Sequence, residues 1–369
     1  MSSSFGKLLK VTIFGQSHSE AIGVVLDGLP VGVRLDMAAI HRFMGRRAPG
    51  TNRFSTARRE ADTPQIIAGL ADGVTCGAPL SALIQNSDAN SKDYDKLRDS
   101  PRPMHADYPA AIKYQGANDI RGGGQFSGRL TAPLCFAGAV AMQILAQQGI
   151  TVGAHIAAIA GEMDTPFDPV AVSASTLSAL SKKAFSVISD EAGSRMQAQI
   201  DAAKEQGDSV GGIIECAAVG VLAGLGEPLY EGLESRLAAA IFGIPAVKGV
   251  DFGAGFSAAA LRGSEHNDPF VMQDGYVVTQ TNNHGGILGG LSTGMPITLR
   301  VAFKPTPSIA KPQKTVSFSA KEAADLAITG RHDPCVVLRA VPCVEAAVAL
   351  VLLDLLIEEK GKKQWISMH

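Results

Sequence analysis

The chain has 369 residues, a formal net charge of −2, 46% hydrophobic residues and 18% charged residues. This composition is typical of a globular protein and excludes extended disorder. The near-zero net charge excludes a general field that would attract nucleic acid or an anionic membrane, so we expect a small-molecule partner and only local anion-binding clusters. The length permits either one large domain or two ordinary ones.

Five cysteines, an odd number with no CxxC pair, argue against a disulfide framework and against a zinc knuckle. The first ten residues lack the apolar core and cleavage site of a secretory signal. Together these features favour a cytoplasmic protein. The apolar stretch Val341 to Ile357 contains Pro342, Glu345 and Asp354, and is short for a membrane span. We predict a buried helix there and no membrane association.

In the amino-terminal part, β-branched runs predict strands at Lys7 to Phe14 and Ile22 to Asp27. The polar residues between them place His18 in a turn. Helical spacing begins at Asp36, a suitable N-cap, and ends near Met44. A basic loop is expected to follow, with arginines at Arg46, Arg47, Arg53, Arg58 and Arg59.

The remaining elements follow a long polar connection at 85–109, which carries His105 and leads to the triple glycine Gly122 to Gly124. An alanine-rich apolar helix is expected from Ser127 to Gln148. Further helices are predicted at 191–205, 231–242, 320–328 and 344–358, and strands at 150–160, 211–221, 276–281 and 297–303. Because no Ser- or Pro-rich linker interrupts the pattern, we predict a single domain over 1–369 of mixed α and β structure.

An internal similarity suggests a duplication. His18, Ile22, Gly23, Gly28, Pro30 and Arg34 recur at a shift of 266 as His284, Leu288, Gly289, Gly294, Pro296 and Arg300. The run Gly45-Arg46-Arg47-Ala48-Pro49 recurs as Gly330-Arg331-His332-Asp333-Pro334. We hypothesise two pseudo-equivalent halves that share one core. Different local folds at the two segments would contradict this hypothesis.

The triple glycine before a predicted helix favours a phosphate or flavin cradle, because the N–H groups at a helix start face an anion and glycine lets the anion approach. A tight turn before a packed helix is an equally good interpretation of the motif alone. Ser127 stands where a dinucleotide-binding GxGxxG motif needs its third glycine, and no GxxxxGK[ST] loop occurs.

The arginine cluster around Arg47 favours a substrate that carries phosphate and carboxylate groups, because guanidinium forks pair with both. A solvated surface is the common alternative. A nucleic-acid patch is disfavoured by the net charge and by the few aromatic residues nearby.

His18 and His105 are candidates for proton exchange near neutral pH, although a single loop histidine is more often structural. Asp333 lies in the run Arg331-His332-Asp333-Pro334-Cys335, which combines a cation, a base and a stiff turn. The run Lys304-Pro305-Thr306-Pro307-Ser308 suits a phosphate or a flavin ring, or is an ordinary proline-rich loop. No HExxH or clustered cysteine spacing indicates a metal site.

Together these stretches resemble the chorismate synthase family from Gly15 to Glu345. The ordered motifs that carry the resemblance are Phe14-Gly15-x-Ser17-His18, Arg47-x-Pro49-Gly50, His105-Ala106-Asp107-Tyr108, Arg121-Gly122-Gly123-Gly124, Gly224-Leu225-Gly226-Glu227-Pro228, Lys304-Pro305-Thr306 and Arg331-His332-Asp333-Pro334-Cys335. The resemblance implies an α+β fold, a layered β-α-β sandwich with two antiparallel sheets around internal helices, assembled as a homotetramer.

The resemblance also implies the reaction. Family members remove phosphate from 5-enolpyruvylshikimate 3-phosphate by 1,4-anti elimination, giving chorismate, and require reduced FMN without net redox change. His18 would then act at the leaving phosphate, and His105 at the reduced flavin. Asp333, relayed through Ser17, would accept a proton from the flavin N5 side.

Further site residues are implied by the same resemblance. Substrate or NADP groups would be bound by Arg47, Arg53 and Arg129. The FMN site would be lined by Gln125, Phe126, Ser127, Pro245, Ala246, Gly289, Lys304, Pro305, Thr306, Pro307, Ser308 and Arg331.

The chain departs from the family pattern at Gln16 and Ser19 of the first motif, and at Gln125-Phe126, where the family has Arg-Ser. Two rival functions remain at this point. A flavin- or phosphate-binding protein without lyase activity would need neither histidine, and an FMN-linked oxidoreductase would consume NAD(P)H in step with product. Whether NADPH or a separate flavin reductase supplies the reduced flavin stays open.

Overall fold

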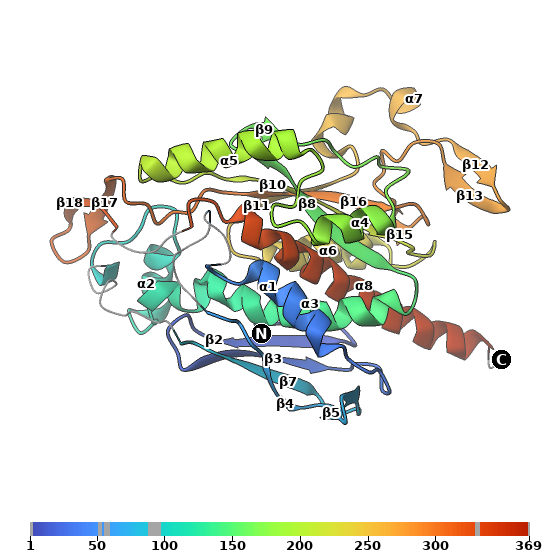
Figure 1. Cartoon of the computed structure of the whole chain (residues 1–369), viewed down its shortest axis with the longest axis horizontal. Coiled ribbons are helices and arrows are strands. Elements are labelled where there is room, and N and C mark those ends of the chain that lie inside the picture. Colours follow the sequence, from blue (N-terminus) through green and yellow to red (C-terminus); the bar gives the residue numbers. More distant parts are fainter. Residues whose placement is uncertain (1–2, 51–53, 55–59, 88–96, 329–332, 368–369) are drawn as a thin grey trace.

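Two five-stranded antiparallel sheets enclose a pair of long helices in the computed structural model, which describes residues 3–50, 54, 60–87, 97–328 and 333–367 (Figure 1). The first sheet has the order β1-β2-β3-β7-β4, with bounds Ser4–Phe5, Lys10–Gly15, Ala21–Asp27, Leu80–Gln85 and Gln65–Ala68. The second has the order β11-β16-β10-β8-β9, with bounds Val247–Phe252, Ile297–Phe303, Gly212–Val219, Thr151–Ile159 and Glu162–Met163. The predicted α+β sandwich is therefore confirmed.

The helices between the sheets are α3, Thr131–Ala146, and α8, Val337–Ser367. Both are apolar on nearly every side, as expected for helices buried on all faces. Each contains a segment long and apolar enough to cross a membrane, but 78% and 89% of these segments are buried inside the protein. They are the core helices, and the prediction of a buried helix at 341–357 is confirmed.

The contact between α3 and α8 is closest at Gly138, where an added Cβ would overlap the Cβ of Ala346. Glycine is therefore required at this position for the two backbones to approach. The hydrophobic core is continuous from Leu9, just before β2, to Leu355 in α8. This continuity supports treating the chain as one domain.

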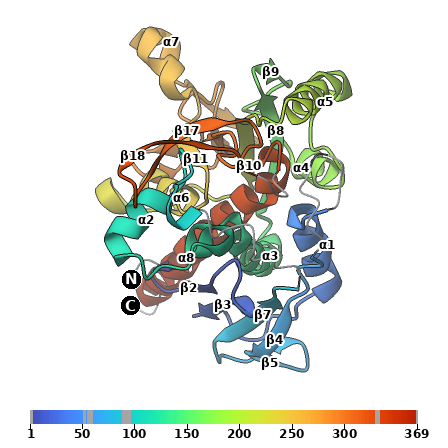
Figure 2. The ribbon, with the colours of Figure 1, turned by 90° about the vertical axis from the view of Figure 1, so that its left-hand side faces the viewer.

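The second sheet is covered on both faces, by α8 on the inner side and by α4 and α5 on the outer side (Figure 2). Its strand β8 is accordingly buried along almost its whole length, and it lacks the alternation of a half-exposed strand. The other helices are α1, Met37–Arg47; α2, Asp107–Tyr114; α4, Ala174–Ser181; α5, Asp190–Glu205; α6, Leu233–Phe242; and the short α7, Gly263–His266.

Four small two-stranded sheets complete the described structure. They pair β5 with β6, Leu70–Ala71 and Val74–Thr75; β12 with β13, Phe270–Gln273 and Tyr276–Thr279; β14 with β15, Ile287–Leu288 and Leu291–Ser292; and β17 with β18, Gln313–Ser317 and Glu322–Leu326. The β12–β13 hairpin and α7 project from the body as an arm, visible in two views (Figures 1 and 2).

Two sequence predictions about elements are wrong. The helix expected at 320–328 is strand β18, which pairs with β17 through registers such as Thr315 with Ala324. Its alanines and glutamate favour a helix, but the pairing partner overrides that local preference. Arg46 and Arg47 lie in the last turn of α1 rather than in a loop, because the helix continues past Gly45 to Ala48.

The duplication hypothesis is also wrong for the segments that suggested it. His18 lies in the turn before the seven-residue strand β3, whereas the segment after His284 forms two-residue strands joined by a turn at Gly289 and Gly290. The second pair of similar segments lies partly outside the described residues. The glycines and prolines match because both segments contain turns.

The two ends of the chain are tied together at Asp354 of α8. Its carboxylate accepts hydrogen bonds from the backbone N–H groups of Lys7, Leu8 and Leu9, at 2.7, 2.9 and 2.7 Å. Arg236 of α6 pairs with the same carboxylate. The start of the first sheet is thereby fixed to a helix near the end of the chain.

Candidate active site

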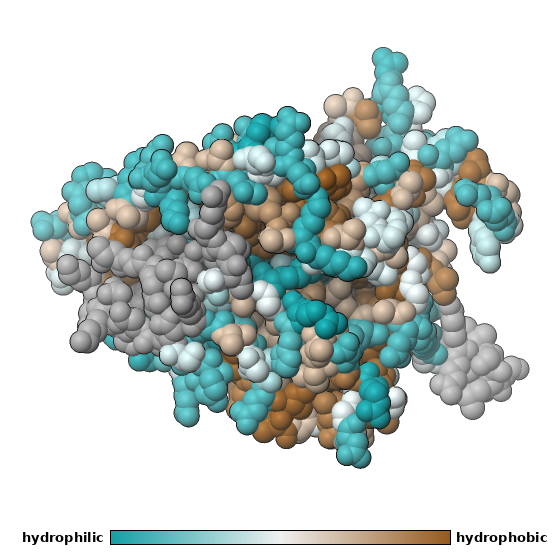
Figure 3. Space-filling model, in the orientation of Figure 1, coloured by the Kyte–Doolittle hydropathy of each residue, from teal (hydrophilic) through white to brown (hydrophobic). Residues whose placement is uncertain are grey.

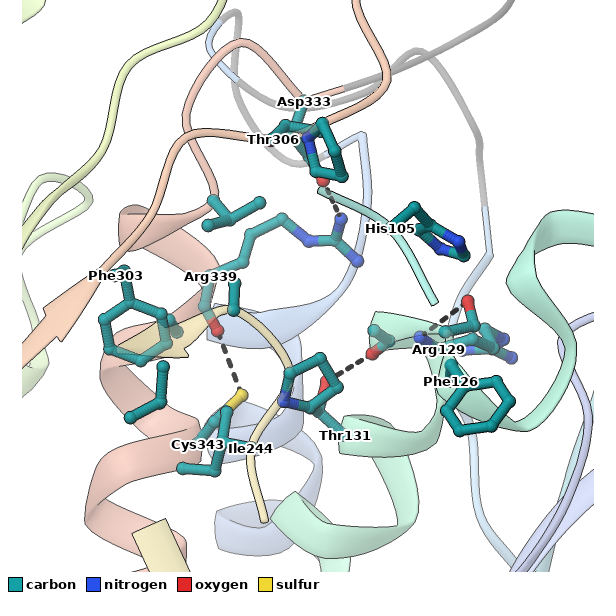
Figure 4. Close-up of a pocket in the computed structure, with 18 of the residues that line it drawn as sticks. His105, Phe126, Arg129, Thr131, Ile244, Phe303, Thr306, Asp333, Arg339 and Cys343 are labelled. Atoms are coloured by element: carbon teal, nitrogen blue, oxygen red, sulfur yellow. Dashed lines mark hydrogen bonds and ion pairs between the residues drawn. The ribbon is translucent and has the colours of Figure 1, made fainter. Parts of the chain in front are cut away.

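A cavity of about 580 Å³ opens where the amino ends of α3 and α8 meet the loops of both sheets. Its described walls come from the turn after β2, the segments around His105 and the triple glycine, the end of α6, the loop after β16 and the start of α8. Figure 4 shows His105 on one side of this cavity and Arg339 and Asp333 on another, with Arg129 and Phe126 toward the triple-glycine segment. Segments far apart in sequence therefore build one site.

The triple glycine lies against both candidate histidines. Gly122, Gly123 and Gly124 all have positive φ, at 59°, 84° and 54°. A Cβ on Gly122 would collide with Ser17 and with the ring of His18, and one on Gly123 would lie 3.0 Å from Nε2 of His105. The predicted cradle is thus a segment without side chains, on which two imidazoles from separate loops converge.

Ser17 and His18 are held by this segment. The Ser17 N–H donates to the Gly124 carbonyl at 3.1 Å, and the Ser17 side chain is buried and lines the cavity. His18 is half-buried beside Gly122, as predicted from its place between two strands. Ser19, one of the departures from the family pattern, closes this turn with a hydroxyl that donates to the Gln16 carbonyl at 2.8 Å.

His105 belongs to a buried cluster with Asp107 and Arg102. Its Nδ1 lies 2.6 Å from Oδ1 of Asp107, and Arg102 donates to both oxygens of that carboxylate, at 2.7 and 2.8 Å. Arg102 also lies 3.1 Å from Nδ1. Because an ionised carboxylate only accepts, the 2.6 Å contact makes Nδ1–H the donor to Asp107, so Arg102 makes no hydrogen bond to Nδ1 and Nε2 of the neutral ring is left as an acceptor beside Gly123.

Burial lowers the pKa of His105 below its ordinary value, and the nearby cations Arg102 and Lys304 act in the same direction, against the raising effect of Asp107. Arg102 and His105 hold the pKa of Asp107 far below its usual range despite its burial. The cluster therefore presents a neutral imidazole to the cavity at neutral pH, beside a permanently charged ion pair.

Arg47 and Arg129, two of the three arginines predicted to bind substrate or NADP, lie together on the cavity wall, and each is already paired with a carboxylate. Asp62 accepts from Arg47 at 2.6 Å and also pairs with Arg129, and Glu60 lies 3.1 Å from Arg129. Arg47 and Arg129 lower the pKa of Asp62 below its ordinary value, against the effect of burial. The carboxylates fix the orientation of the guanidinium groups, which stay at the wall of the cavity.

Asp333 lines the cavity and pairs with Arg339 at 2.6 Å. Arg339, in the first turns of α8, also donates to the Arg47 carbonyl at 2.9 Å. It therefore connects the end of α1 to the segment that carries Asp333. Asp333 and Ser17 lie on different walls of the cavity. The proton relay to Asp333 through Ser17 therefore stays a prediction.

The loop after β16 carries a buried side-chain hydroxyl, that of Thr306. Oγ1 of Thr306 is buried and, among the described residues, has no hydrogen-bond partner. Lys304 pairs with the Met104 carbonyl, and Ser308 accepts from Arg102 at 3.2 Å. Burial and the charge of Lys248 lower the pKa of Lys304.

Other predicted FMN residues also reach the cavity. Pro245 and Ala246 lie on the wall, and Ala246 has a φ of 75°, a strained backbone that is common at functional sites. Ala246 accepts from the Lys304 N–H at 3.0 Å, which joins it to the loop after β16. Further residues of the predicted set on the wall are Gln125, Phe126, Ser127 and Pro307.

Some predicted residues are placed elsewhere. Gly289 lies in the turn between β14 and β15, Pro305 is exposed, and the His18 ring lies against Gly122; none of the three is among the described residues that line the cavity. Arg53 and Arg331 lie outside the described residues, so their positions remain predictions. Within the described ranges no group of three or more His, Cys, Asp or Glu side chains is arranged to hold a metal ion.

Sequence reasoning missed four charged residues of the site: Glu60, Asp62, Arg102 and Arg339. Arg102 stands three residues before His105 between two prolines, a signal that was visible in the sequence. Arg339 and Asp62 had no such signal, since each is identified only by a partner that the fold brings to it.

Comparisons with known proteins identify the family of the chain. A sequence model of the family described as "Chorismate synthase" matches residues 9–357. The chain is 48% identical over 357 residues to a chorismate synthase of Thermococcus gammatolerans, covering 96% of this chain and 98% of that protein. It is 45% identical over 367 residues to that of Lancefieldella parvula, covering 96% of each. A solved structure described as "Crystal Structure of Chorismate Synthase" matches with a TM-score of 0.76 and 27% identity, over 96% of this chain and 93% of that one.

Proposed function

The chain belongs to the chorismate synthase family and is a carbon–oxygen lyase of the shikimate pathway, and we propose that its main cavity binds reduced FMN beside 5-enolpyruvylshikimate 3-phosphate. The observation that carries this assignment of the site is the convergence of Ser17, His18 and His105 on the triple glycine, at a cavity that Ser17, His105 and Asp333 line.

The residues present fit a flavin phosphate. The cavity falls within the size range of cofactor sites. The Thr306 hydroxyl is buried without a protein partner among the described residues, so it can bond a ligand atom. The absence of side chains at Gly122 and Gly123 makes room for Ser17 and the two imidazoles against the backbone. When bound, reduced FMN supplies electron density to the substrate as its C–O bond breaks.

We assign the flavin side of the chemistry to His105. A neutral imidazole with Nδ1–H held by Asp107 keeps an acceptor at Nε2, so it can hold a proton of the reduced cofactor in place. Lys304, Thr306 and Ser308 would orient the cofactor from the loop after β16. Gln125 and Phe126 stand where the family pattern has a cation and a hydroxyl. The side-chain amide of Gln125 donates a hydrogen bond to the Tyr114 hydroxyl at 2.9 Å.

We assign the phosphate side to His18 and to the arginine pair. His18 would donate a proton to the departing phosphate, and Arg47 and Arg129, already oriented by Asp62, would bind the anionic groups of the substrate. Asp333, held by Arg339, would accept the proton lost from the ring, through Ser17. The fixed charges around the cavity are therefore arranged to receive a substrate that carries one phosphate and two carboxylates.

We further propose a homotetramer in the cytoplasm. The projecting arm exposes Phe270, Met272 and Tyr276, which are 64%, 70% and 75% exposed. Figure 3 shows apolar surface at this arm and along the outer face of the first sheet, where Phe14 and Ile67 are 42% and 58% exposed. Apolar surface of this kind marks protein–protein contacts.

The deciding experiment mixes protein, chemically reduced FMN and substrate without oxygen. Phosphate and the diene absorbance of chorismate should appear in equal amounts, with no NAD(P)H added. Binding of FMN without either product would favour a binding protein, and product in proportion to NAD(P)H consumed would favour an oxidoreductase. Adding NADPH with oxidised FMN then tests whether the chain reduces its own flavin or needs a separate reductase.

Two variants test the assigned roles. His105→Ala and Asp333→Ala should each lower kcat by about 10²- to 10⁴-fold, the usual effect of losing a positioned acid or base. His41→Ala, on the exposed side of α1, is the matched control and should retain wild-type rates. Unchanged phosphate release in both site variants would contradict the mechanism even if the chain is an active lyase.

A further inference from the structure

Two buried thiols that the proposed chemistry does not use lie in contact between α3 and α8. Sγ of Cys135 is 3.8 Å from Sγ of Cys343, and the two residues are 0% and 2% exposed. Cys343 lines the main cavity, where its S–H also lies 3.3 Å from the Arg339 carbonyl (Figure 4). Cys76, Cys216 and Cys335 are the remaining free cysteines.

The helices approach closely enough at this point for a covalent bond. One turn after the thiols, Gly138 packs against Ala346 so tightly that a Cβ would not fit. Positions 135 and 343 therefore lie on facing sides of two backbones in near contact. A disulfide requires Cα atoms within about 7 Å, a spacing that helices in such contact provide.

The two sulfurs differ in reactivity. The hydrogen bond from Cys135, and the positive charge of Arg47, lower the pKa of Cys343, although burial opposes this effect. Burial raises the pKa of Cys135. Cys343 is thus the better nucleophile, and it is the thiol that a small oxidant in the cavity can contact. Cys135 does not line the cavity and would act as the resolving thiol, which attacks the oxidised Cys343.

We propose that Cys135 and Cys343 form a reversible disulfide when peroxide enters the cavity. The Cys343 thiolate attacks one peroxide oxygen, giving a sulfenic acid and hydroxide, which takes up the proton lost from the thiol to form water. The Cys135 sulfur then bonds to the Cys343 sulfur and releases a second water. In total, two thiols are oxidised, one hydrogen peroxide is reduced and two waters form. A dithiol reductant reverses the step.

The bond would alter the cavity wall. It removes the S–H that faces the Arg339 carbonyl and draws the Cys343 side chain toward α3. Arg339 holds Asp333, and the segment before α3 carries Ser127 and Arg129. Oxidation is therefore expected to lower lyase activity at least tenfold, an expectation that rests on the proposed function.

The test treats the native chain with hydrogen peroxide under denaturant-free conditions. The expected result is a fall from five free thiols to three, a Cys135–Cys343 linked peptide after digestion, and full recovery with dithiothreitol. Cys216→Ala, a matched buried cysteine, should still form the linked peptide. Cys135→Ala and Cys343→Ala should each lack it and lose no thiol pair.

The thiol readouts need no substrate, so they stand even if the lyase assignment fails. Absence of the linked peptide in the folded wild type, with peroxide in excess, would overturn the proposal. So would an equal loss of thiols in Cys135→Ala. A linked peptide without any fall in activity would overturn the effect on the cavity. Any covalent dimer formed through exposed Cys76 is recognised by its loss in Cys76→Ser.

Discussion

Gly122 leaves no room for a side chain between Ser17 and His18. Its φ of 59° is also unfavourable for other residues. Gly122→Ala should therefore displace both side chains, and a shift of about 1 Å at a catalytic group can cost about 100-fold in rate. Steady-state kinetics will show this as a fall in kcat. Gly263→Ala in the projecting arm, where an added Cβ meets nothing within 4 Å, is the control and should be nearly neutral.

Asp107 sets the protonation of His105. Its hydrogen bond and charge raise the pKa of His105, while burial, the first cause of the net shift, lowers it. Asp107→Asn removes only the raising effect, so the pKa of His105 should fall further below its ordinary value of about 6.5. An NMR titration of the ring protons, assigned by comparison with His105→Gln, measures this change. A rise in the pKa would contradict the proposed hydrogen bonding.

Asp62 neutralises two buried arginines. Its removal in Asp62→Asn leaves Arg47 and Arg129 without their shared carboxylate and should lower the free energy of unfolding by about 3 kcal/mol or more. Asparagine tolerates the positive φ at this position, so backbone strain is not introduced. Urea denaturation at neutral pH measures the loss.

The same carboxylate gives a signed pH dependence. Its pKa in the folded protein lies below the ordinary value of about 3.9. The stabilisation is therefore complete above that value and is lost as the pH falls through it toward the folded pKa. Below pH 4 the wild type should lose stability more steeply than Asp62→Asn. Parallel slopes for the two proteins would contradict the ion-pair account.

At the scale of elements, the packing of α3 on α8 determines the site, because both helices begin at the cavity. Gly138→Ala should cost about 1–3 kcal/mol by overpacking this contact. Ala346→Gly removes the nearest clashing atom, the Cβ at 2.2 Å, but leaves its Cα at 2.4 Å, so the double variant should regain only part of the lost stability. A double-mutant cycle measured by denaturation tests this coupling. If the changes in the free energy of unfolding of the two single variants simply add in the double variant, residues 138 and 346 do not interact and the described contact is wrong.

The sequence predicts most elements because their patterns are strong. β-branched runs predict β2, β3 and β16, and the long apolar helix α3 is expected from its composition. The wrong helix at 320–328 has a local preference that only the partner strand β17 reverses. Local patterns do not contain such tertiary pairing.

For the site, too, local sequence patterns predict one part and tertiary packing decides the other. The motifs identify His18, His105 and Asp333 as candidates, but the fold decides that His105 and Asp333 line one cavity, while His18 lies beside it against Gly122. The pairing of Asp62 with both arginines follows from the fold alone. Sequence thus proposes the chemical groups, and the packing of α3 and α8 decides which of them meet.

For the whole molecule, the projecting arm offers a test of assembly. Replacing Phe270, Met272 and Tyr276 by serine removes exposed apolar surface without touching the core. Light scattering should show a tetramer for the wild type and smaller species for the triple variant. Val316→Ser, on the other exposed hairpin, should leave the mass unchanged. A monomeric wild type would contradict the proposed homotetramer.

The three hydrogen bonds that join Asp354 to the backbone of Lys7, Leu8 and Leu9 have a consequence for biosynthesis. A nascent chain exposes its first sheet long before α8, whose Asp354 holds the start of that sheet, leaves the ribosome. Contacts that span nearly the whole sequence also slow folding. The amino-terminal strands therefore cannot complete their packing until α8 has been synthesised. We expect a ribosome-bound chain truncated before residue 337 to remain sensitive to protease and dependent on chaperones.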